Sequence, residues 1–136
     1  MAFLNLSCHY FIHHFVFQYT VVGSDGPAVL LVHVFGAFHE HYRDNLCSIA
    51  EAGNRVWAVT LLGFGKSEKP NIVYTELMWA ELLRDFIIEV VGQPAHLVGN
   101  SMGGKFCLAL TPQFAVSPVR LLVSVTKSRL SFSPFN

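Results

Sequence analysis

The last 36 residues of the chain contain no aspartate, no glutamate and no histidine. All nine acidic residues and all seven histidines lie within residues 1–100. Four basic residues follow, namely Lys105, Arg120, Lys127 and Arg129. Side chains that accept a proton near neutral pH are therefore confined to the part of the chain before residue 101.

Charge is scarce as well as unevenly placed. Charged residues make up 13% of the sequence, about half the usual share. Nine Lys and Arg balance nine Asp and Glu, which leaves no basic excess for general nucleic-acid binding. Hydrophobic residues make up 52%, enough to exclude a disordered chain, and 136 residues suit one modest domain.

The three cysteines, Cys8, Cys47 and Cys107, are odd in number and widely spaced. They form no C-x-x-C pair and no even set, so they predict neither a zinc site nor a disulfide framework. We expect reduced thiols, no metal and no organic cofactor.

The N-terminal stretch 2–22 is apolar and aromatic but matches no targeting class. It has no basic residue and no small-residue cleavage signature, which argues against a secretory signal. Polar residues interrupt the run, so membrane association is not expected. We assign residues 1–16 to an apolar N-terminal segment outside the domain, and the stretch does not fix a cellular location.

Alternating strand and helix patterns follow this segment. Short apolar runs predict strands over 17–22, 28–33, 55–61 and 95–100, with 119–125 as a candidate fifth. Helical spacing is found over 38–49, 76–91 and 102–110, with Thr75 as an N-cap and Gly53 and Gly92 as helix ends. This alternation predicts an α/β fold with an open, mostly parallel sheet and flanking helices. The domain is expected over 17–125, with a tail at 126–136.

A G-x-S-x-G motif, Gly99-Asn100-Ser101-Met102-Gly103, connects the 95–100 strand to the 102–110 helix. In a nucleophile elbow, a sharp strand-to-helix turn exposes the serine hydroxyl above the sheet. The small residues two positions before and after the serine let neighbouring backbone approach closely. The helix N-terminus also favours developing negative charge.

Two further segments agree with this motif: His33-Val34-Phe35-Gly36 and Gly63-Phe64-Gly65-Lys66-Ser67 each follow a predicted strand. Together with the motif at Ser101, they resemble the front half of an α/β-hydrolase, over about residues 17–110. The segments LLGFGKSEKP and HLVGNSMGG are similar to those of plant plastid members of this family related to chlorophyll dephytylase and pheophytinase. GNSMGG also resembles carbon–carbon bond hydrolases. A chloroplast location is implied by this resemblance alone.

The resemblance implies a serine hydrolase that transfers an acyl group from a small apolar ester to water. Ser101 would be the nucleophile, and the backbone N–H groups of Phe35 and Met102 would form the oxyanion hole. His33 would be structural. Neither a cofactor nor a metal is implied.

The sequence departs from the family pattern at three places. Val34 replaces a glycine in the oxyanion segment, and Thr60 stands where many members have aspartate. The triad acid and histidine, which should follow Ser101 in the chain, are absent. His39 and His41 are the remaining alternatives for a base, and a His39-Glu40-His41 metal site fits no common spacing. We therefore expect a chain that is inactive as given, with a non-catalytic truncated isoform or a sensor or binding protein as alternatives.

A truncated core has a structural consequence. The family sheet has about eight strands, and this sequence supplies four or five. The strand at 95–100, or 119–125 if it forms, would present an apolar edge. Self-association through that edge is expected.

Overall fold

The computed structural model describes residues 7–110. Its strands are β1 (Ser7–Ile12), β2 (Phe15–Val22), β3 (Ala28–Val32), β4 (Arg55–Thr60) and β5 (Ala95–Gly99). Its helical elements are η1 (His39–Tyr42), α1 (Arg43–Glu51), α2 (Glu76–Phe86), η2 (Ile87–Val91) and α3 (Met102–Leu110). The candidate strand at 119–125 lies outside the described residues.

The five strands form one open sheet in the order β1-β2-β4-β3-β5. β3 pairs in parallel with both β4 and β5, whereas β2 pairs antiparallel with both β1 and β4. The expected α/β sheet is confirmed, but it is mixed, because its parallel pairing is confined to one half. Short connections at residues 13–14 and 23–27 reverse the chain, whereas each parallel crossover uses a helix.

The sheet begins before residue 17, where sequence patterning placed its first strand. β1 lies within residues 1–16, which the sequence pattern places outside the domain, and the Ile12 side chain of β1 is fully buried. The β1–β2 turn consists of His13 and His14, with φ values of +50° and +70°. Two-residue turns of this kind usually contain glycine or asparagine. The pair of histidines therefore did not predict a turn.

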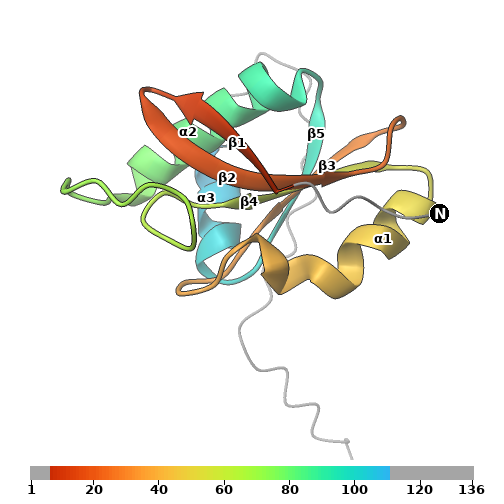
Figure 1. Ribbon diagram of the computed structural model, residues 1–136, viewed down its shortest axis with the longest axis horizontal. Helices are drawn as coiled ribbons and strands as arrows, with labels where there is room; N and C mark the ends of the chain where they lie inside the picture. Colours follow the sequence, from red (N-terminus) through yellow and green to blue (C-terminus); the bar gives the residue numbers. More distant parts are fainter. Residues whose placement is uncertain (1–6, 111–136) are drawn as a thin grey trace, which may run out of the picture.

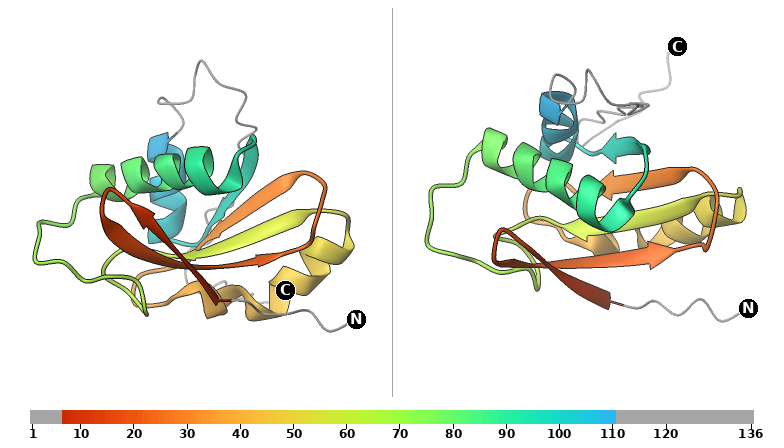
Figure 2. Two further views of the ribbon diagram at one scale, coloured as in Figure 1. Left: turned by 45° about the horizontal axis from the view of Figure 1, so that its top comes forward. Right: turned by 90° about the horizontal axis from the view of Figure 1, so that it is seen from above.

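Helices cover both faces of the sheet (Figures 1 and 2). α2 and α3 lie on one face, over a core that includes Phe17, Trp57, Phe86 and Phe106. α1 lies on the other face, over a smaller cluster of Val22, Val29, Leu31, Tyr42, Leu46, Val56 and Ala58. All five residues of β3 are buried, as the continuous apolar run predicted.

The expected helix ends are confirmed. The Thr75 hydroxyl accepts a hydrogen bond from the Met78 N–H at 3.1 Å, which caps α2. Gly53 and Gly92 have φ values of +89° and +69°, the left-handed geometry that favours glycine after a helix. The predicted 76–91 helix changes at Ile87, where its last five residues form a π turn.

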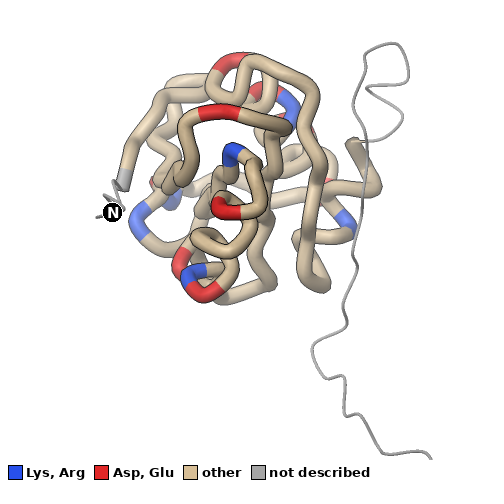
Figure 3. The backbone as a smooth tube through the Cα atoms, turned by 90° about the vertical axis from the view of Figure 1, so that its right-hand side faces the viewer, with Lys and Arg blue, Asp and Glu red and all other residues tan. Residues whose placement is uncertain are grey.

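β5 lies at one end of the described sheet and pairs only with β3 within it. Lys and Arg are interspersed with Asp and Glu along the described chain (Figure 3). Within residues 7–110, no helix has both the length and the apolar character needed to cross a bilayer.

Candidate functional site

Ser101 occupies the turn between β5 and α3 with a φ of +52°. A non-glycine residue pays roughly 1–2 kcal/mol to adopt this left-handed conformation. The turn is held by backbone bonds: the Asn100 N–H donates to Val32 O at 3.1 Å, and the Gly103 N–H donates to Asn100 O at 3.0 Å. The chain therefore holds Ser101 in a strained conformation between the end of β5 and the N-terminus of α3.

The two motif glycines are required by contact with the backbone. A Cβ on Gly99 would lie 2.4 Å from both Gly103 C and Gly104 N. A Cβ on Gly103 would lie 2.3 Å from Val32 O and 2.6 Å from His33 O. Backbone atoms cannot move aside as a flexible side chain can. The G-x-S-x-G spacing thus reflects the close packing of β3, β5 and α3.

His33, at the end of β3, is fully buried and uses both ring nitrogens. Nε2 accepts from the Leu61 N–H at 2.9 Å, so Nδ1 carries the proton and donates to Val34 O at 2.7 Å. Burial lowers the pKa of His33 to about 4, despite the opposing bond to Val34. A neutral ring with both nitrogens engaged is a structural residue, as the resemblance implied.

The segment after His33 forms a tight turn, in which the Ala37 N–H donates to Val34 O at 3.1 Å. Gly36 takes the left-handed position, with a φ of +76°, whereas Val34 does not. The valine at the family's glycine position is therefore compatible with the backbone here. The N–H groups of Phe35 and Met102 donate to no other residue within 7–110.

Thr60, at the family's aspartate position, organises neighbouring loops. Its hydroxyl accepts from the His39 N–H at 3.0 Å and lies 3.0 Å from His39 Nδ1. The Ser67 hydroxyl donates to Thr60 O at 2.6 Å and accepts from the Gln18 N–H at 2.9 Å. Ser67 is buried and bonded in this way, which makes it a structural residue.

The two alternative bases lie in different places. His39 is buried and bonded to Thr60, on the α1 face of the sheet. His41 Nε2 lies 3.1 Å from Asn100 Nδ2, so its ring contacts the residue that precedes Ser101. Sequence reasoning did not find this contact, because η1 and β5 are far apart in the chain.

Tyr42 is a second residue that the sequence did not single out. Its hydroxyl donates to Val32 O at 2.9 Å, the same carbonyl that receives the Asn100 N–H. Burial raises the pKa of Tyr42 to about 12, so it remains a hydrogen-bond donor. Tyr42 thereby ties η1 to the backbone beneath the Ser101 turn.

An aromatic pocket lies beside the Phe35 segment. It has a volume of about 510 Å³ and is lined by Phe35, Gly63, Phe64, Lys69, Pro70, Asn71, Tyr74 and Trp79. The Phe35 ring stands edge-on to Phe64 at 5.4 Å, and Trp79 stacks on Tyr74 at 5.4 Å. Trp79 is largely buried and its indole N–H donates to Leu62 O at 3.0 Å, so it forms the floor of the pocket. We name this group the aromatic pocket.

The described residues do not assemble a full catalytic triad around Ser101. Within the described part of the chain, no cluster of three His, Cys, Asp or Glu residues could hold a metal ion. The third cysteine, Cys107, is buried and its pKa is raised to about 12 by that burial. Its thiol is therefore not a competing nucleophile.

A mixed α/β sheet with a strained serine between strand and helix defines a hydrolase-type architecture. Residues 27–136 match the model of the alpha/beta hydrolase fold family. The chain belongs to that family.

Individual relatives agree with this family. The chain is 28% identical to pheophytinase from Arabidopsis thaliana, over 82% of this chain and 28% of the relative. It is 40% identical to 2-hydroxy-6-oxo-6-(2'-aminophenyl)hexa-2,4-dienoic acid hydrolase from Metapseudomonas resinovorans, over 69% of this chain and 33% of the relative.

A thioesterase domain from the curacin biosynthetic pathway shares the fold, with a TM-score of 0.79 and 24% identity. That match covers 87% of this chain and 45% of the thioesterase domain. The chain spans about a third of the length of the two curated relatives, the pheophytinase and the dienoic acid hydrolase.

Proposed function

We propose that residues 7–110 form the nucleophile-bearing part of a serine hydrolase that cleaves apolar esters. The observation that carries this proposal is the conformation of Ser101, which is held at a φ of +52° between β5 and α3. A protein accepts such strain where it serves a function, and the family places a nucleophile at this turn.

The proposed chemistry is acyl transfer to water. The Ser101 hydroxyl attacks the ester carbonyl, the alcohol leaves, and water releases the acid from the acyl-enzyme. The Phe35 and Met102 N–H groups, which have no other acceptor among the described residues, would stabilise the oxyanion. Each such donor contributes about 3 kcal/mol to the transition state.

This chemistry needs a base that the chain does not supply. A serine hydroxyl is a weak nucleophile until a neighbouring group takes its proton. No His, Asp or Glu follows Ser101. His33 and His39 are buried and bonded to Leu61 and Thr60, and the hydrogen-bond contact of His41 is with Asn100. We therefore propose that the 136-residue chain does not turn over substrate by itself, and that turnover belongs to a form that carries the acid and the histidine.

The aromatic pocket supports an apolar substrate. Its walls combine Phe35, Phe64, Tyr74 and Trp79, and its volume of about 510 Å³ lies within the range of small-molecule sites. Phe35 is 70% exposed, so its ring is available to a bound molecule.

A second candidate is cleavage of a carbon–carbon bond. The observation that favours it is the 40% identity to a hydrolase of a 2-hydroxy-6-oxo-dienoic acid. The third hypothesis is a non-catalytic sensor or binding protein. It holds if the aromatic pocket binds a ligand and Ser101 does not react.

Imidazole added to the buffer tests the proposal, because it can replace the missing base. We expect the chain to hydrolyse p-nitrophenyl butyrate in a Ser101-dependent manner only with imidazole present. Ser101→Ala should abolish that increment, whereas Ser48→Ala, on α1, should retain it. Ser101-dependent hydrolysis without imidazole would contradict the inactivity of the chain. If a fluorophosphonate probe fails to label Ser101 even with imidazole present, the nucleophile assignment is wrong.

A further inference from the structure

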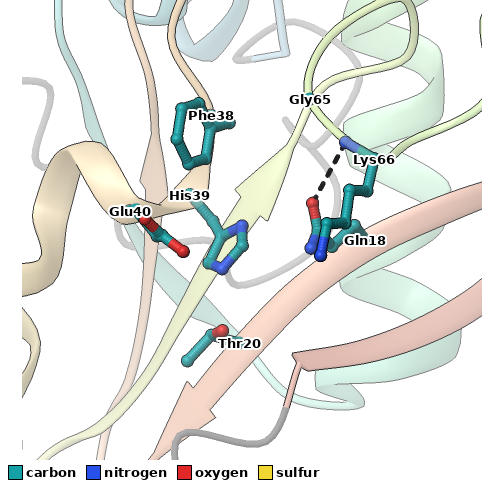
Figure 4. A pocket seen from close by; sticks show the side chains of 7 residues that line it. All are labelled: Gln18, Thr20, Phe38, His39, Glu40, Gly65 and Lys66. Atoms are coloured by element: carbon teal, nitrogen blue, oxygen red, sulfur yellow. Dashed lines mark hydrogen bonds between the residues drawn. The ribbon is translucent and has the colours of Figure 1, made fainter.

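A second, polar pocket lies on the α1 side of the sheet, between β2, η1 and the loop after β4 (Figure 4). Its volume is about 250 Å³, and its lining consists of Gln18, Thr20, Phe38, His39, Glu40, Gly65 and Lys66. None of these residues lines the aromatic pocket or belongs to the Ser101 turn. We name this group the polar pocket.

The floor of the polar pocket contains an unsatisfied hydroxyl. Thr20 is 1% exposed, and its Oγ1 has no hydrogen-bond partner among the described residues. Figure 4 shows Thr20 beneath the His39 ring. A buried hydroxyl without a partner destabilises the folded chain, and a bound acceptor would offset that cost.

The His39 ring directs a second donor into the same space. Its Nδ1 and its backbone N–H both lie 3.0 Å from Thr60 Oγ1, whereas that hydroxyl is 3.4 Å from Gln18 Oε1. The Thr60 hydroxyl has one proton, which it can donate either to Gln18 Oε1 at 3.4 Å or to the closer His39 Nδ1 at 3.0 Å. Donation to Nδ1 leaves the proton of the neutral imidazole on Nε2, and a carboxylate in the pocket selects that arrangement. Burial lowers the pKa of His39, which keeps the ring neutral.

Charge and size limit what the pocket can hold. Lys66 and Glu40 are both exposed residues of the lining, and they contribute one positive and one negative charge. The ammonium group suits one carboxylate, whereas the Glu40 charge disfavours a doubly charged group such as phosphate. The Phe38 ring supplies an apolar wall for a short carbon chain. A volume of about 250 Å³ is smaller than most drug-sized sites.

We infer that the polar pocket binds a small monocarboxylate, with its oxygens on Thr20 Oγ1 and His39 Nε2 and the Lys66 ammonium group at the rim. The Gln18 side chain completes the wall, because its Oε1 accepts from the Lys66 N–H at 3.3 Å. This inference does not depend on reactivity at Ser101.

The test is an NMR titration of the 136-residue chain with sodium propionate, against sodium chloride at equal ionic strength. Propionate should shift the His39 imidazole and Lys66 backbone resonances saturably and raise the pKa of His39. Thr20→Val should weaken binding about tenfold, because it removes a hydrogen bond to a charged group. Thr20→Ser should restore it.

Two charge variants complete the test. Lys66→Gln should weaken propionate binding severalfold, whereas Lys105→Gln, on α3, removes the same charge elsewhere and should leave binding unchanged. Thr20→Val should also raise the stability of the ligand-free chain, since it removes an unsatisfied hydroxyl. That combination of higher stability and weaker binding separates a binding role from a structural one.

Three outcomes would overturn the inference. The first is the absence of saturable shifts with propionate. The second is unchanged binding in Thr20→Val. The third is tighter binding of inorganic phosphate than of propionate, which would show that the pocket selects charge and not a carboxylate.

Discussion

The Cα of Gly103 packs so closely on the Val32 carbonyl that an added Cβ would lie 2.3 Å from Val32 O. α3 therefore packs against the end of β3, next to the Ser101 turn. Val32 O also receives hydrogen bonds from the Asn100 N–H and the Tyr42 hydroxyl. One carbonyl thus joins β3, β5, η1 and α3 at the candidate site.

Gly103→Ala should therefore disrupt the packing of α3 on the sheet. Because the clash is with backbone, we expect the free energy of unfolding to fall by about 3 kcal/mol or more. Urea denaturation followed by circular dichroism measures this loss. Lys105→Ala, an exposed change two residues later on the same helix, should shift the midpoint little. If both variants unfold at the same urea concentration, the contact does not constrain the turn.

Ser101 offers a direct measure of the strain at the turn. Glycine adopts a φ of +52° without the cost that a Cβ imposes, so Ser101→Gly should be more stable than Ser101→Ala by about 1 kcal/mol. Both variants lack the hydroxyl, so the difference in their urea midpoints reports the strain at this φ less the extra entropy that glycine gives the unfolded chain. A Ser101→Gly variant that is less stable than Ser101→Ala by the usual glycine penalty would mean that the turn stores no strain at this residue.

Features that depend on residues close together in the sequence could be predicted from it. Local signals placed the cap at Thr75, the helix ends at Gly53 and Gly92 and the turn at Ser101, because each depends on residues within a few positions. The fully buried run of β3 also predicted a central strand.

Other features depend on residues distant in sequence, and patterning did not locate them. Pairing of His41 with Asn100 and of Thr60 with His39 requires the tertiary fold to bring η1 beside β5 and β4. The β1–β2 hairpin was missed for a different reason, because His13 and His14 adopt left-handed conformations without the usual glycine or asparagine.

His33 should make the stability of the chain depend on pH. Its folded pKa of about 4 lies below the ordinary value of 6.5, so the unfolded chain takes up a proton first as the pH falls. The free energy of unfolding should therefore decrease from about pH 6.5 downward, by about 3 kcal/mol at pH 4. Urea denaturation at intervals from pH 7.5 to pH 4 measures this loss.

The imidazole resonances assign that pH dependence to His33. The His33 ring should titrate near pH 4 in an NMR experiment, and His33→Gln should be less stable at pH 7.5 with a flatter profile between pH 6.5 and 5. His14→Asn, in the β1–β2 turn, should leave the His33 titration unchanged. A His33 ring that titrates near 6.5 would disprove the buried neutral assignment.

The edge of β5 gives the last prediction. Within the described sheet β5 pairs only with β3, and its Val98 side chain is half-buried against the α1-side cluster. An open strand edge is a template for pairing with another chain, and a charged side chain there opposes it. The chain should self-associate as its concentration rises, and Val98→Lys should shift its sedimentation toward the monomer. Leu108→Lys adds the same charge on an exposed position of α3 and should leave association intact. A monomeric wild-type chain at high concentration, or equal association in both variants, would rule out pairing through β5.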